Sequence, residues 1–154
     1  MTEWPSIHRD VVAAFATAWA APEPHAWDPI LDEDVLLAQP MIRTVRGRAG
    51  WWSEVARLLA LLPDLRAEVL DWSGSEDRLF VHIRFTATLA GRPLVWSAVD
   101  VMRLGSAGTI VRRDSYFDPV PPVAAIARRP RAWGRWWRSG MSPFTARRAL
   151  LAPR

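Results

Sequence analysis

The chain has 154 residues, of which 50% are hydrophobic, and it contains ten Trp and no Cys. This length suits one domain with a tail, and the composition excludes a disordered chain, a disulfide scaffold and a cysteine-based zinc site. The charge is uneven, because residues 1–118 carry 12 Arg and 16 acidic side chains whereas residues 119–154 carry eight Arg and no acid, so the basic character belongs to the tail.

Helical spacing dominates the first 62 residues. Apolar side chains recur every three or four positions, which gives each helix one buried stripe, and proline marks the helix ends. Asp28-Pro29 opens a short second helix in which residues 32–34 face water. We also expect helices over 6–21 and 50–62, a short strand over 35–38 and a polar turn over 43–50.

Residues 65–117 have the pattern of an antiparallel sheet. β-Branched and aromatic residues are frequent, and short turns containing Gly or Pro separate the runs. Alternation places Asp100 on one side of a strand with Trp96, Ala98 and Met102, and that side is otherwise apolar. We expect strands over 65–73, 78–90, 94–104 and 109–117. The order of elements predicts an α+β domain over residues 1–120, with helices on one face of the sheet.

A basic, Trp-rich extension follows over residues 121–154. Residues 123–138 are expected to be helical and broken around Pro130, and Ser142-Pro143 starts a further short segment. Arg beside Trp at positions 133, 136 and 137 suits an anionic membrane surface or nucleic acid, but the apolar stripe is short. We therefore favour packing of the extension onto the protein, over a pocket mouth or a neighbouring subunit, and expect no nucleic-acid partner.

Other patterns bear on location and cofactors. The sequence has no run of about 18 apolar residues and no signal-like N-terminus, so we expect a cytoplasmic protein. It has no His, Asp and Glu cluster at metal-ligand spacing, no Gly-rich phosphate loop and no nucleophile elbow, so we expect neither a metal nor another cofactor. His82 and Arg84 fall on the outer face of the sheet by alternation, which favours a dimer interface over catalysis.

Four short motifs, in this order of elements, carry a family resemblance. They are Leu37-Ala-Gln-Pro40, Arg46-Gly-Arg48, Val99-Asp-Val-Met-Arg103 and Ser115-Tyr-Phe-Asp-Pro119. The sequence over residues 6–120 resembles the nuclear transport factor 2-like superfamily, and its SnoaL-like (polyketide-cyclase-like) branch most of all. The resemblance implies a conical fold in which a curved antiparallel sheet wraps around N-terminal helices and leaves a deep pocket. It also implies a homodimer formed through the outer face of the sheet.

The resemblance extends to ketosteroid isomerases at some site positions only. Asp100 matches an aspartate that stays protonated and donates a hydrogen bond to the developing oxyanion, and Phe117 matches an aromatic pocket wall. Phe15 stands where those enzymes have the tyrosine of the oxyanion hole, and Gln39 stands where they have the general base. Plain ketosteroid isomerase chemistry is therefore not expected.

A resemblance to limonene-epoxide hydrolases also fails at individual residues. Ser115 stands at the place of their last aspartate, and the strand over 79–89 contains no carboxylate. Cyclases of the SnoaL-like branch rely on one acidic residue with polar pocket contacts. Asp100 and Gln39 could supply that minimum, with Asp114 as a second carboxyl if the register of the last strand slips by one.

Each candidate has a structural alternative. Burial among apolar groups disfavours the charged form of Asp100 and suits a general acid, but the same carboxylate could pair with Arg103 or with an Arg of the next strand. Gln39 could orient a ligand carbonyl or close a strand end, and Ser115 could contact the ligand or leave room for it. An aromatic set could line the pocket or form ordinary core; its members are Phe15, Trp19, Trp52, Phe85, Trp96 and Phe117.

We therefore expect a hydrophobic small molecule as the partner of a pocket. The preferred hypothesis is a cofactor-independent isomerase, cyclase or hydrolase that runs acid–base chemistry on an apolar carbonyl- or epoxide-bearing metabolite. The alternative is a non-catalytic binder or carrier of a hydrophobic ligand. A third possibility is a dimeric scaffold whose basic tail is the working part.

Overall fold

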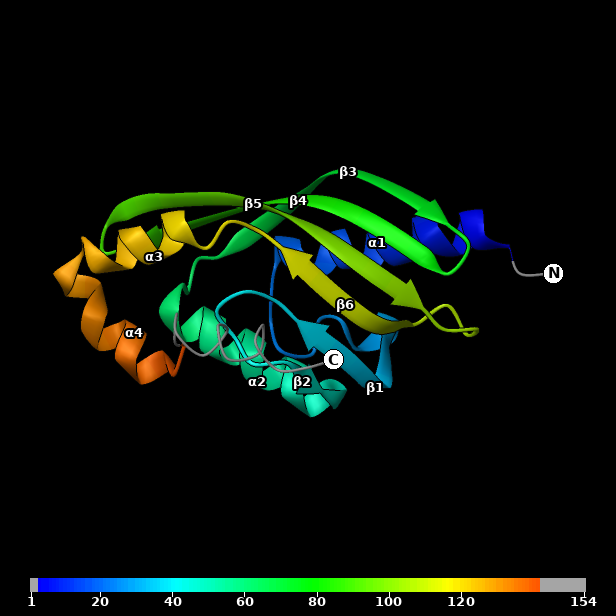
Figure 1. Cartoon of the computed structure of the whole chain (residues 1–154), viewed down its shortest axis with the longest axis horizontal. Coiled ribbons are helices and arrows are strands. Elements are labelled where there is room, and N and C mark those ends of the chain that lie inside the picture. The colour runs from blue at the N-terminus through cyan, green and yellow to red at the C-terminus, as the bar shows by residue number, and fades with distance from the viewer. Residues whose placement is uncertain (1–2, 142–154) are drawn as a thin grey trace.

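The computed structural model describes residues 3–141 and contains four α-helices and six strands within them (Figure 1). The first half holds α1 (Trp4–Ala20), β1 (Leu31–Ala38), β2 (Val45–Arg46) and α2 (Gly47–Leu61). The second half holds β3 (Arg66–Ser75), β4 (Arg78–Leu89), β5 (Arg92–Leu104), β6 (Ile110–Tyr116), α3 (Val120–Ala127) and α4 (Trp133–Ser139). Two short 3₁₀ turns, Asp28–Ile30 and Pro130–Ala132, precede β1 and α4. The expected α+β class is confirmed.

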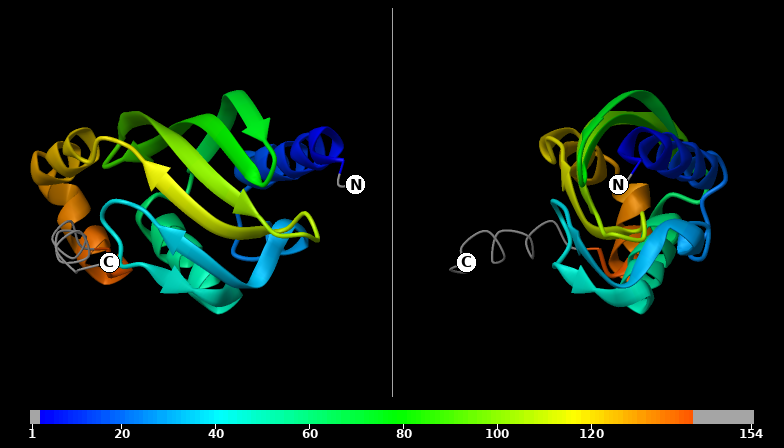
Figure 2. Two further views of the ribbon diagram at one scale, coloured as in Figure 1. Left: turned by 45° about the vertical axis from the view of Figure 1, so that its right-hand side comes forward. Right: turned by 90° about the vertical axis from the view of Figure 1, so that its right-hand side faces the viewer.

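The six strands form one sheet in the order β2-β1-β6-β5-β4-β3. The run from β3 to β6 is the expected antiparallel meander. The first strand is added at the far side of β6 and runs parallel to it, so the sheet is mixed rather than purely antiparallel. The view along the molecule in Figure 2 shows the sheet arching over the helices, which is the expected conical arrangement.

Two local expectations in the N-terminal half are wrong. Residues 31–34 are not helical but begin β1, because Leu31 is completely buried and pairs with Ile110 of β6. Pairing with the sheet there overrides the helix signal of Asp28-Pro29, which yields only a 3₁₀ turn. The polar turn expected over 43–50 contains β2, which pairs with the end of β1, and α2 already begins at Gly47.

The core lies between the concave face of the sheet and the first two helices. In β4 every second side chain, from Leu79 to Leu89, is buried, as period-2 alternation requires. The helix α1 packs against β3, and α2 packs against β1 and α4. Large aromatic side chains occupy the space between these layers; they include Phe15, Trp19, Trp27 and Trp51.

The C-terminal helices pack onto the domain. As expected, residues 123–138 are helical with a break at Pro130, and the segment expected to start at residue 142 lies outside the described residues. Arg129 fixes the break to the β4–β5 turn, because its guanidinium donates hydrogen bonds to the backbone oxygens of Leu89 (3.0 Å), Arg92 (3.2 Å) and Pro93 (3.2 Å). Trp133 Nε1 donates a 2.9 Å bond to the Ile126 carbonyl, which ties α4 to α3.

Candidate functional site

An apolar cavity of about 60 Å³ lies between the sheet, α2 and the C-terminal helices. Its walls are mostly aliphatic and aromatic side chains from β4, β5 and α2. Polar groups enter it only from Gln39, Arg113 and Ser115 among the lining residues. Pro122 and Ile126 of α3, together with Met141, complete the wall on the C-terminal side. The extension is therefore part of the cavity and not a separate appendage.

Most of the predicted ligand-binding residues line this cavity. They are Trp19, Gln39, Phe85, Trp96, Ser115 and Phe117. The rings of Phe85 and Trp96 stack with centroids 4.8 Å apart, and Trp19 meets Phe85 edge-on at 4.9 Å, so the three form one aromatic wall. Phe15 is completely buried and does not line the cavity. Trp52 is also absent from the lining, because its Nε1 donates a 2.7 Å bond to Asp28 Oδ1 outside it.

Asp100 forms a buried ion pair with Arg113 of the neighbouring strand. Nε and Nη2 of Arg113 both contact Oδ2 of Asp100, at 2.8 and 2.7 Å. The side chains are 0% and 4% exposed, so this pair is isolated from bulk water. The sequence allowed two interpretations of Asp100: a carboxyl that acts as an acid, or a carboxylate paired with an Arg of the next strand. The observed geometry is the second of these.

Asp100 does not itself line the cavity, whereas Arg113 does. The carboxylate therefore reaches the cavity only through its contact with Arg113. Oδ1 of Asp100 has no hydrogen-bond partner within the described chain. Both contacts to Asp100 use Nε and Nη2 of Arg113, and Nη1 makes no hydrogen bond to another described residue. Arg113 is thus a fixed cationic donor among the residues that line a mostly apolar space.

Three aromatic rings surround the Arg113 guanidinium. Its central carbon lies 5.6 Å from the ring centroid of Phe15, 5.8 Å from Trp19 and 5.4 Å from Trp51. These distances are in the range of cation–π attraction, which strengthens when water is excluded. Phe15 therefore serves the site indirectly, as one of the rings that hold the cation.

Asp114 is not brought to the cavity. The register of β6 is regular there, with Arg113 and Ser115 buried on the inner face and Asp114 on the outer face. Asp114 accepts two hydrogen bonds from Arg112, at 2.7 and 2.9 Å, and this pairing raises the pKa of Arg112. The slip that would have turned Asp114 inward does not occur.

Sequence reasoning did not single out Arg113. Alternation along β6 places Arg113 on the same inner face as Ser115, and this pattern could have identified Arg113 as a buried residue. Burying an Arg side chain in a core is ordinarily unfavourable. Here the guanidinium is stabilised by Asp100 and by the rings of Phe15, Trp19 and Trp51, which are far from Arg113 in the sequence. The motif alone could not show that these groups converge.

The remaining ionisable groups with shifted pKa lie away from the cavity. Burial raises the pKa of Glu54, and the nearby Arg57 opposes that shift. The pKa of Asp28 is affected first by burial, which would raise it, but hydrogen bonds from Trp52 and His25 outweigh this and lower it. Arg113 is the one ionisable side chain among the described lining residues. Within residues 3–141, no three His, Asp or Glu side chains are placed to hold a metal ion.

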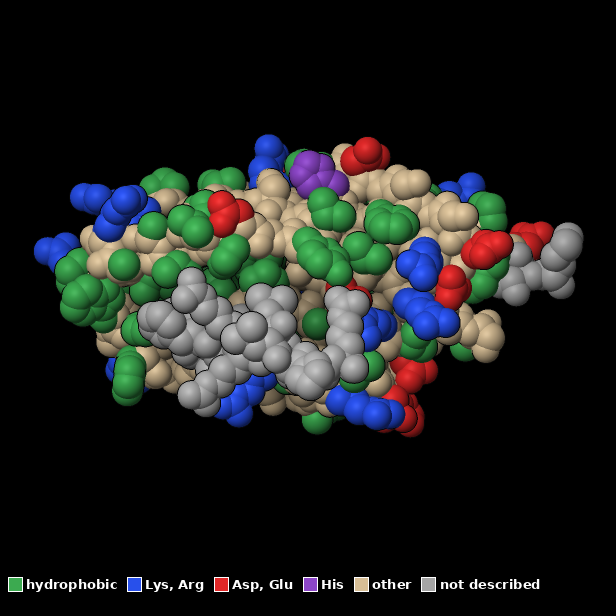
Figure 3. Space-filling model, viewed as in Figure 1, with side chains coloured by type: hydrophobic (Ala, Val, Ile, Leu, Met, Phe, Trp, Pro, Cys, Tyr) green, Lys and Arg blue, Asp and Glu red, His purple; other side chains and the backbone are tan. Residues whose placement is uncertain are grey.

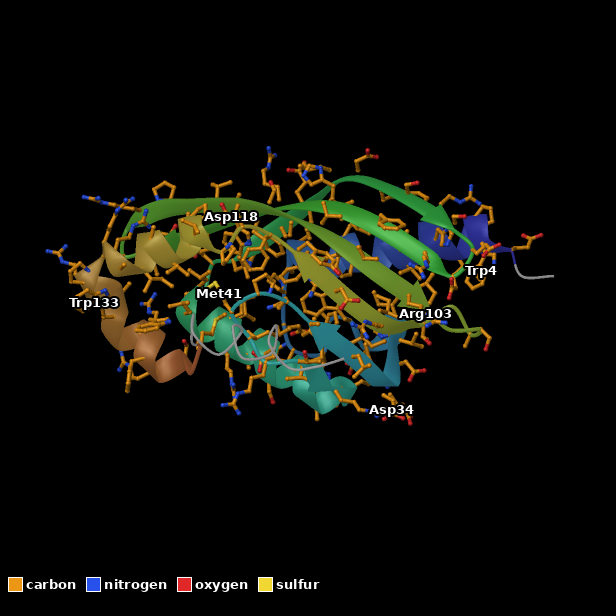
Figure 4. The ribbon with its side chains drawn as sticks, viewed as in Figure 1. Trp4, Asp34, Met41, Arg103, Asp118 and Trp133 are labelled. Carbon is orange, nitrogen blue, oxygen red and sulfur yellow. The ribbon has the colours of Figure 1, made fainter. Side chains whose placement is uncertain are left out.

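Figure 4 shows Met41 between the sheet and the C-terminal helices, with Trp133 at the end of the molecule. Met41 and Met141 both line the cavity.

A second, open pocket of about 290 Å³ lies beside the β4–β5 turn and contains Arg131, Arg135 and Asp64. It shares Leu89 with the apolar cavity but has a mixed polar surface.

Comparison with protein families gives a match to the SnoaL-like domain over residues 12–113. A sequence comparison with curated proteins finds no match. Among the described residues, no helix has the length and apolar character needed to cross a bilayer.

Solved structures with the same fold include three informative neighbours. A candidate SnoaL-like polyketide cyclase from a Jannaschia species has a TM-score of 0.69 at 16% identity, covering 79% of this chain and 92% of its own. A candidate polyketide cyclase from Streptomyces antibioticus has a TM-score of 0.66 at 19% identity, covering 77% and 97%. An epoxide hydrolase from M. tuberculosis has a TM-score of 0.65 at 14% identity, covering 84% and 96%. At these identities the likeness establishes the fold only.

Proposed function

This chain belongs to the SnoaL-like domain family, and we propose that its cavity binds a small apolar metabolite whose carbonyl oxygen is held by Arg113. The observation that carries the proposal is a single cationic donor, fixed by Asp100 and three aromatic rings, among the residues that line a mostly apolar space. Ligand sites are typically of this kind, with an apolar lining and a few placed polar groups that fix orientation.

Two further hydrogen-bond donors line the same cavity. Gln39 and Ser115 line the cavity and can donate through an amide and a hydroxyl. A ligand oxygen that accepts from Arg113 and from one of these groups would offset the cost of burying them.

The chemistry that suits this site is stabilisation of negative charge on oxygen. When a carbonyl compound is enolised, or when its carbonyl is attacked by a carbon of the same molecule, the oxygen becomes an oxyanion. A fixed guanidinium in an apolar cavity stabilises that charge more than it stabilises the neutral carbonyl, which lowers the barrier. Asp100 then acts as a positioning residue that orients Arg113. Isomerisation or ring closure of a carbonyl metabolite is therefore our preferred reaction class.

The cavity offers less support for epoxide hydrolysis. Activation of water by the arrangement expected in limonene-epoxide hydrolases needs carboxylates at the reacting centre. The described lining contains none, and Asp100 is not part of it but is paired with Arg113. We therefore place the carbonyl substrate ahead of the epoxide.

A non-catalytic carrier is the second candidate. The described lining contains no Asp, Glu, His, Tyr, Lys or Cys that could take a proton from a substrate. A carrier needs only the apolar wall and the oriented donor. An enzyme would need either a water molecule admitted beside the substrate or a basic group of the substrate itself to take the proton once the oxygen is held by Arg113.

The size of the cavity limits what can bind without rearrangement. It is about 60 Å³, whereas an engineered apolar cavity that accepts benzene is about 150 Å³. Benzene and any larger ligand must therefore displace part of the wall. Ile126 and Met141 are the natural candidates, because they belong to the C-terminal segment that closes the cavity.

Two measurements separate binding from catalysis. Acetophenone and α-methylstyrene have the same shape, but only the first has a carbonyl oxygen, so the protein should prefer acetophenone in an NMR titration. Exchange of the methyl protons of acetophenone into heavy water then reports enolisation. Faster exchange in wild type than in an Asp100→Leu/Arg113→Met variant supports the enzyme, and preferential binding without faster exchange supports the carrier. Equal binding of the two ligands contradicts both.

We also propose that two copies pair through the outer face of the sheet. Val99 of β5 lies beside His82 of β4 and Tyr116 of β6 in the register, so these side chains form a continuous row. Val99 is 42% and Tyr116 62% exposed. An exposed apolar row of this kind is a common feature of protein interfaces.

A further inference from the structure

The C-terminal helix α4 presents indole and guanidinium groups to solvent at one end of the molecule. We propose that this Trp–Arg surface, defined as Arg131, Trp133, Arg135, Trp137 and Arg138, docks onto an anionic lipid bilayer. Figure 4 shows Trp133 at that end, and Figure 3 shows apolar and basic side chains side by side there. The proposal is independent of which ligand occupies the cavity.

The two exposed indoles leave at least half of their surface in solvent, although Trp133 Nε1 also ties α4 to α3. Trp136, Ser139 and Ala132 face the protein and are partly or fully buried. Trp137 is 79% exposed and Trp133 51% exposed, although each carries a large apolar ring. Indole rings favour the headgroup level of a bilayer, where the ring is buried and the N–H stays polar.

The segment that carries these indoles is basic, and Asp64 from outside the segment lines the same open pocket as Arg131 and Arg135. Residues 119–141 contain five Arg and no acidic side chain. Arg131, Arg135 and Arg138 are exposed, and none of the ion pairs between described residues includes them. By contrast, Arg84, Arg103 and Arg112 on the sheet are each paired with a carboxylate. Unpaired surface Arg next to exposed Trp matches a surface of anionic headgroups.

Docking of this surface would bring the cavity close to the bilayer. Ile126 lines the cavity and precedes the surface in sequence, and Met141 lines it and follows the surface. An apolar ligand partitions into lipid, so a segment that both closes the cavity and contacts lipid is suitably placed for exchange between the two. Nucleic acid would satisfy the Arg groups equally, but a duplex gives no apolar layer in which Trp137 and Trp133 can be buried.

Co-sedimentation of the full chain with vesicles tests the proposal. We expect binding to phosphatidylglycerol/phosphatidylcholine vesicles, little binding to pure phosphatidylcholine, and a steep loss of binding at high salt. Each Arg near an anionic surface contributes about fivefold to affinity, so Arg131→Gln/Arg135→Gln/Arg138→Gln should lose about 100-fold. The charge-matched control Arg9→Gln/Arg43→Gln/Arg78→Gln should retain most of the affinity.

The aromatic contribution has its own variant. Trp137→Ala keeps every charge and removes the most exposed ring, so vesicle affinity should fall several-fold while the unfolding midpoint stays the same. An equal loss in the two Arg triple variants would mean that total charge, and not this surface, drives binding, and would overturn the proposal. Tighter binding to single-stranded DNA than to anionic vesicles, with the same dependence on Trp137, would also overturn it in favour of nucleic acid.

Discussion

The buried Asp100–Arg113 pair allows a quantitative prediction about stability. Removing one member of a buried ion pair usually costs about 3–5 kcal/mol, because the other charge stays buried without a partner. Replacing both members with apolar side chains of similar size is often neutral or stabilising. Both side chains are at least 96% buried, so solvent screening does not reduce the expected effect. We therefore predict large losses for Asp100→Leu and for Arg113→Met, and a much smaller change for the double variant.

The structure also predicts which single variant is worse. In Asp100→Leu the guanidinium keeps its contacts with Phe15, Trp19 and Trp51, and cation–π attraction contributes up to about 2 kcal/mol in a desolvated site. In Arg113→Met the carboxylate loses both contacts on Oδ2, while Oδ1 already has no partner in the described chain. Arg113→Met should therefore cost about 1–2 kcal/mol more than Asp100→Leu.

Urea unfolding followed by far-ultraviolet circular dichroism measures all three variants against wild type. A total stability of about 5–15 kcal/mol is usual for a domain of this size, so each single loss is measurable. A single variant that costs less than about 1 kcal/mol would refute the buried-charge reasoning. A double variant that costs as much as the two single variants together would also refute it.

Three further predictions concern other parts of the molecule. Burial raises the pKa of Glu54 above its unfolded value of 4.5, so the contribution of Glu54 to stability is favourable below pH 4.5 and is lost as pH rises through the folded pKa. Glu54→Gln should therefore gain stability relative to wild type between about pH 4 and pH 7. A constant difference between the thermal unfolding midpoints of the two proteins over that range would contradict this prediction. Ile126→Ala should enlarge the cavity, cost about 2–4 kcal/mol in chemical unfolding and bind acetophenone more tightly, so unchanged ligand affinity would argue against a wall formed by α3. Val99→Glu should convert a dimer to a monomer in sedimentation velocity, whereas Val120→Glu on the C-terminal segment should not; identical sedimentation of both variants would exclude the outer face of the sheet as the interface.

Regular patterns in the sequence were enough to predict the main features of the sheet and about a third of the residues that line the cavity. Strict alternation placed Phe85, Trp96, Ser115 and Phe117 on the inner face, and each of them lines the cavity. The mistaken helix at residues 31–34 shows the limit of local signals, since pairing of β1 with β6 joins segments about 75 residues apart along the chain. Local spacing does not contain that information.

The charged part of the site was harder to predict because it is stabilised by contacts between residues that are far apart in the sequence. Asp100 was identified by its apolar neighbours, but its role depends on Arg113, which is held by rings from α1 and α2. Closure of the cavity by α3 and Met141 depends on packing of the C-terminal segment, which lies beyond the family match over residues 12–113. The size of the cavity is thus determined partly outside the shared domain.

Binding of acetophenone relative to α-methylstyrene, in wild type and in Asp100→Leu/Arg113→Met, tests most directly whether Arg113 holds a ligand oxygen. A hydrogen bond from a charged donor contributes about 1.5–3 kcal/mol, so wild type should favour acetophenone by about 10- to 100-fold. The double variant keeps an apolar cavity, and its preference should fall to near unity. A preference that is the same in both proteins would contradict the role of Arg113, even if both ligands bind.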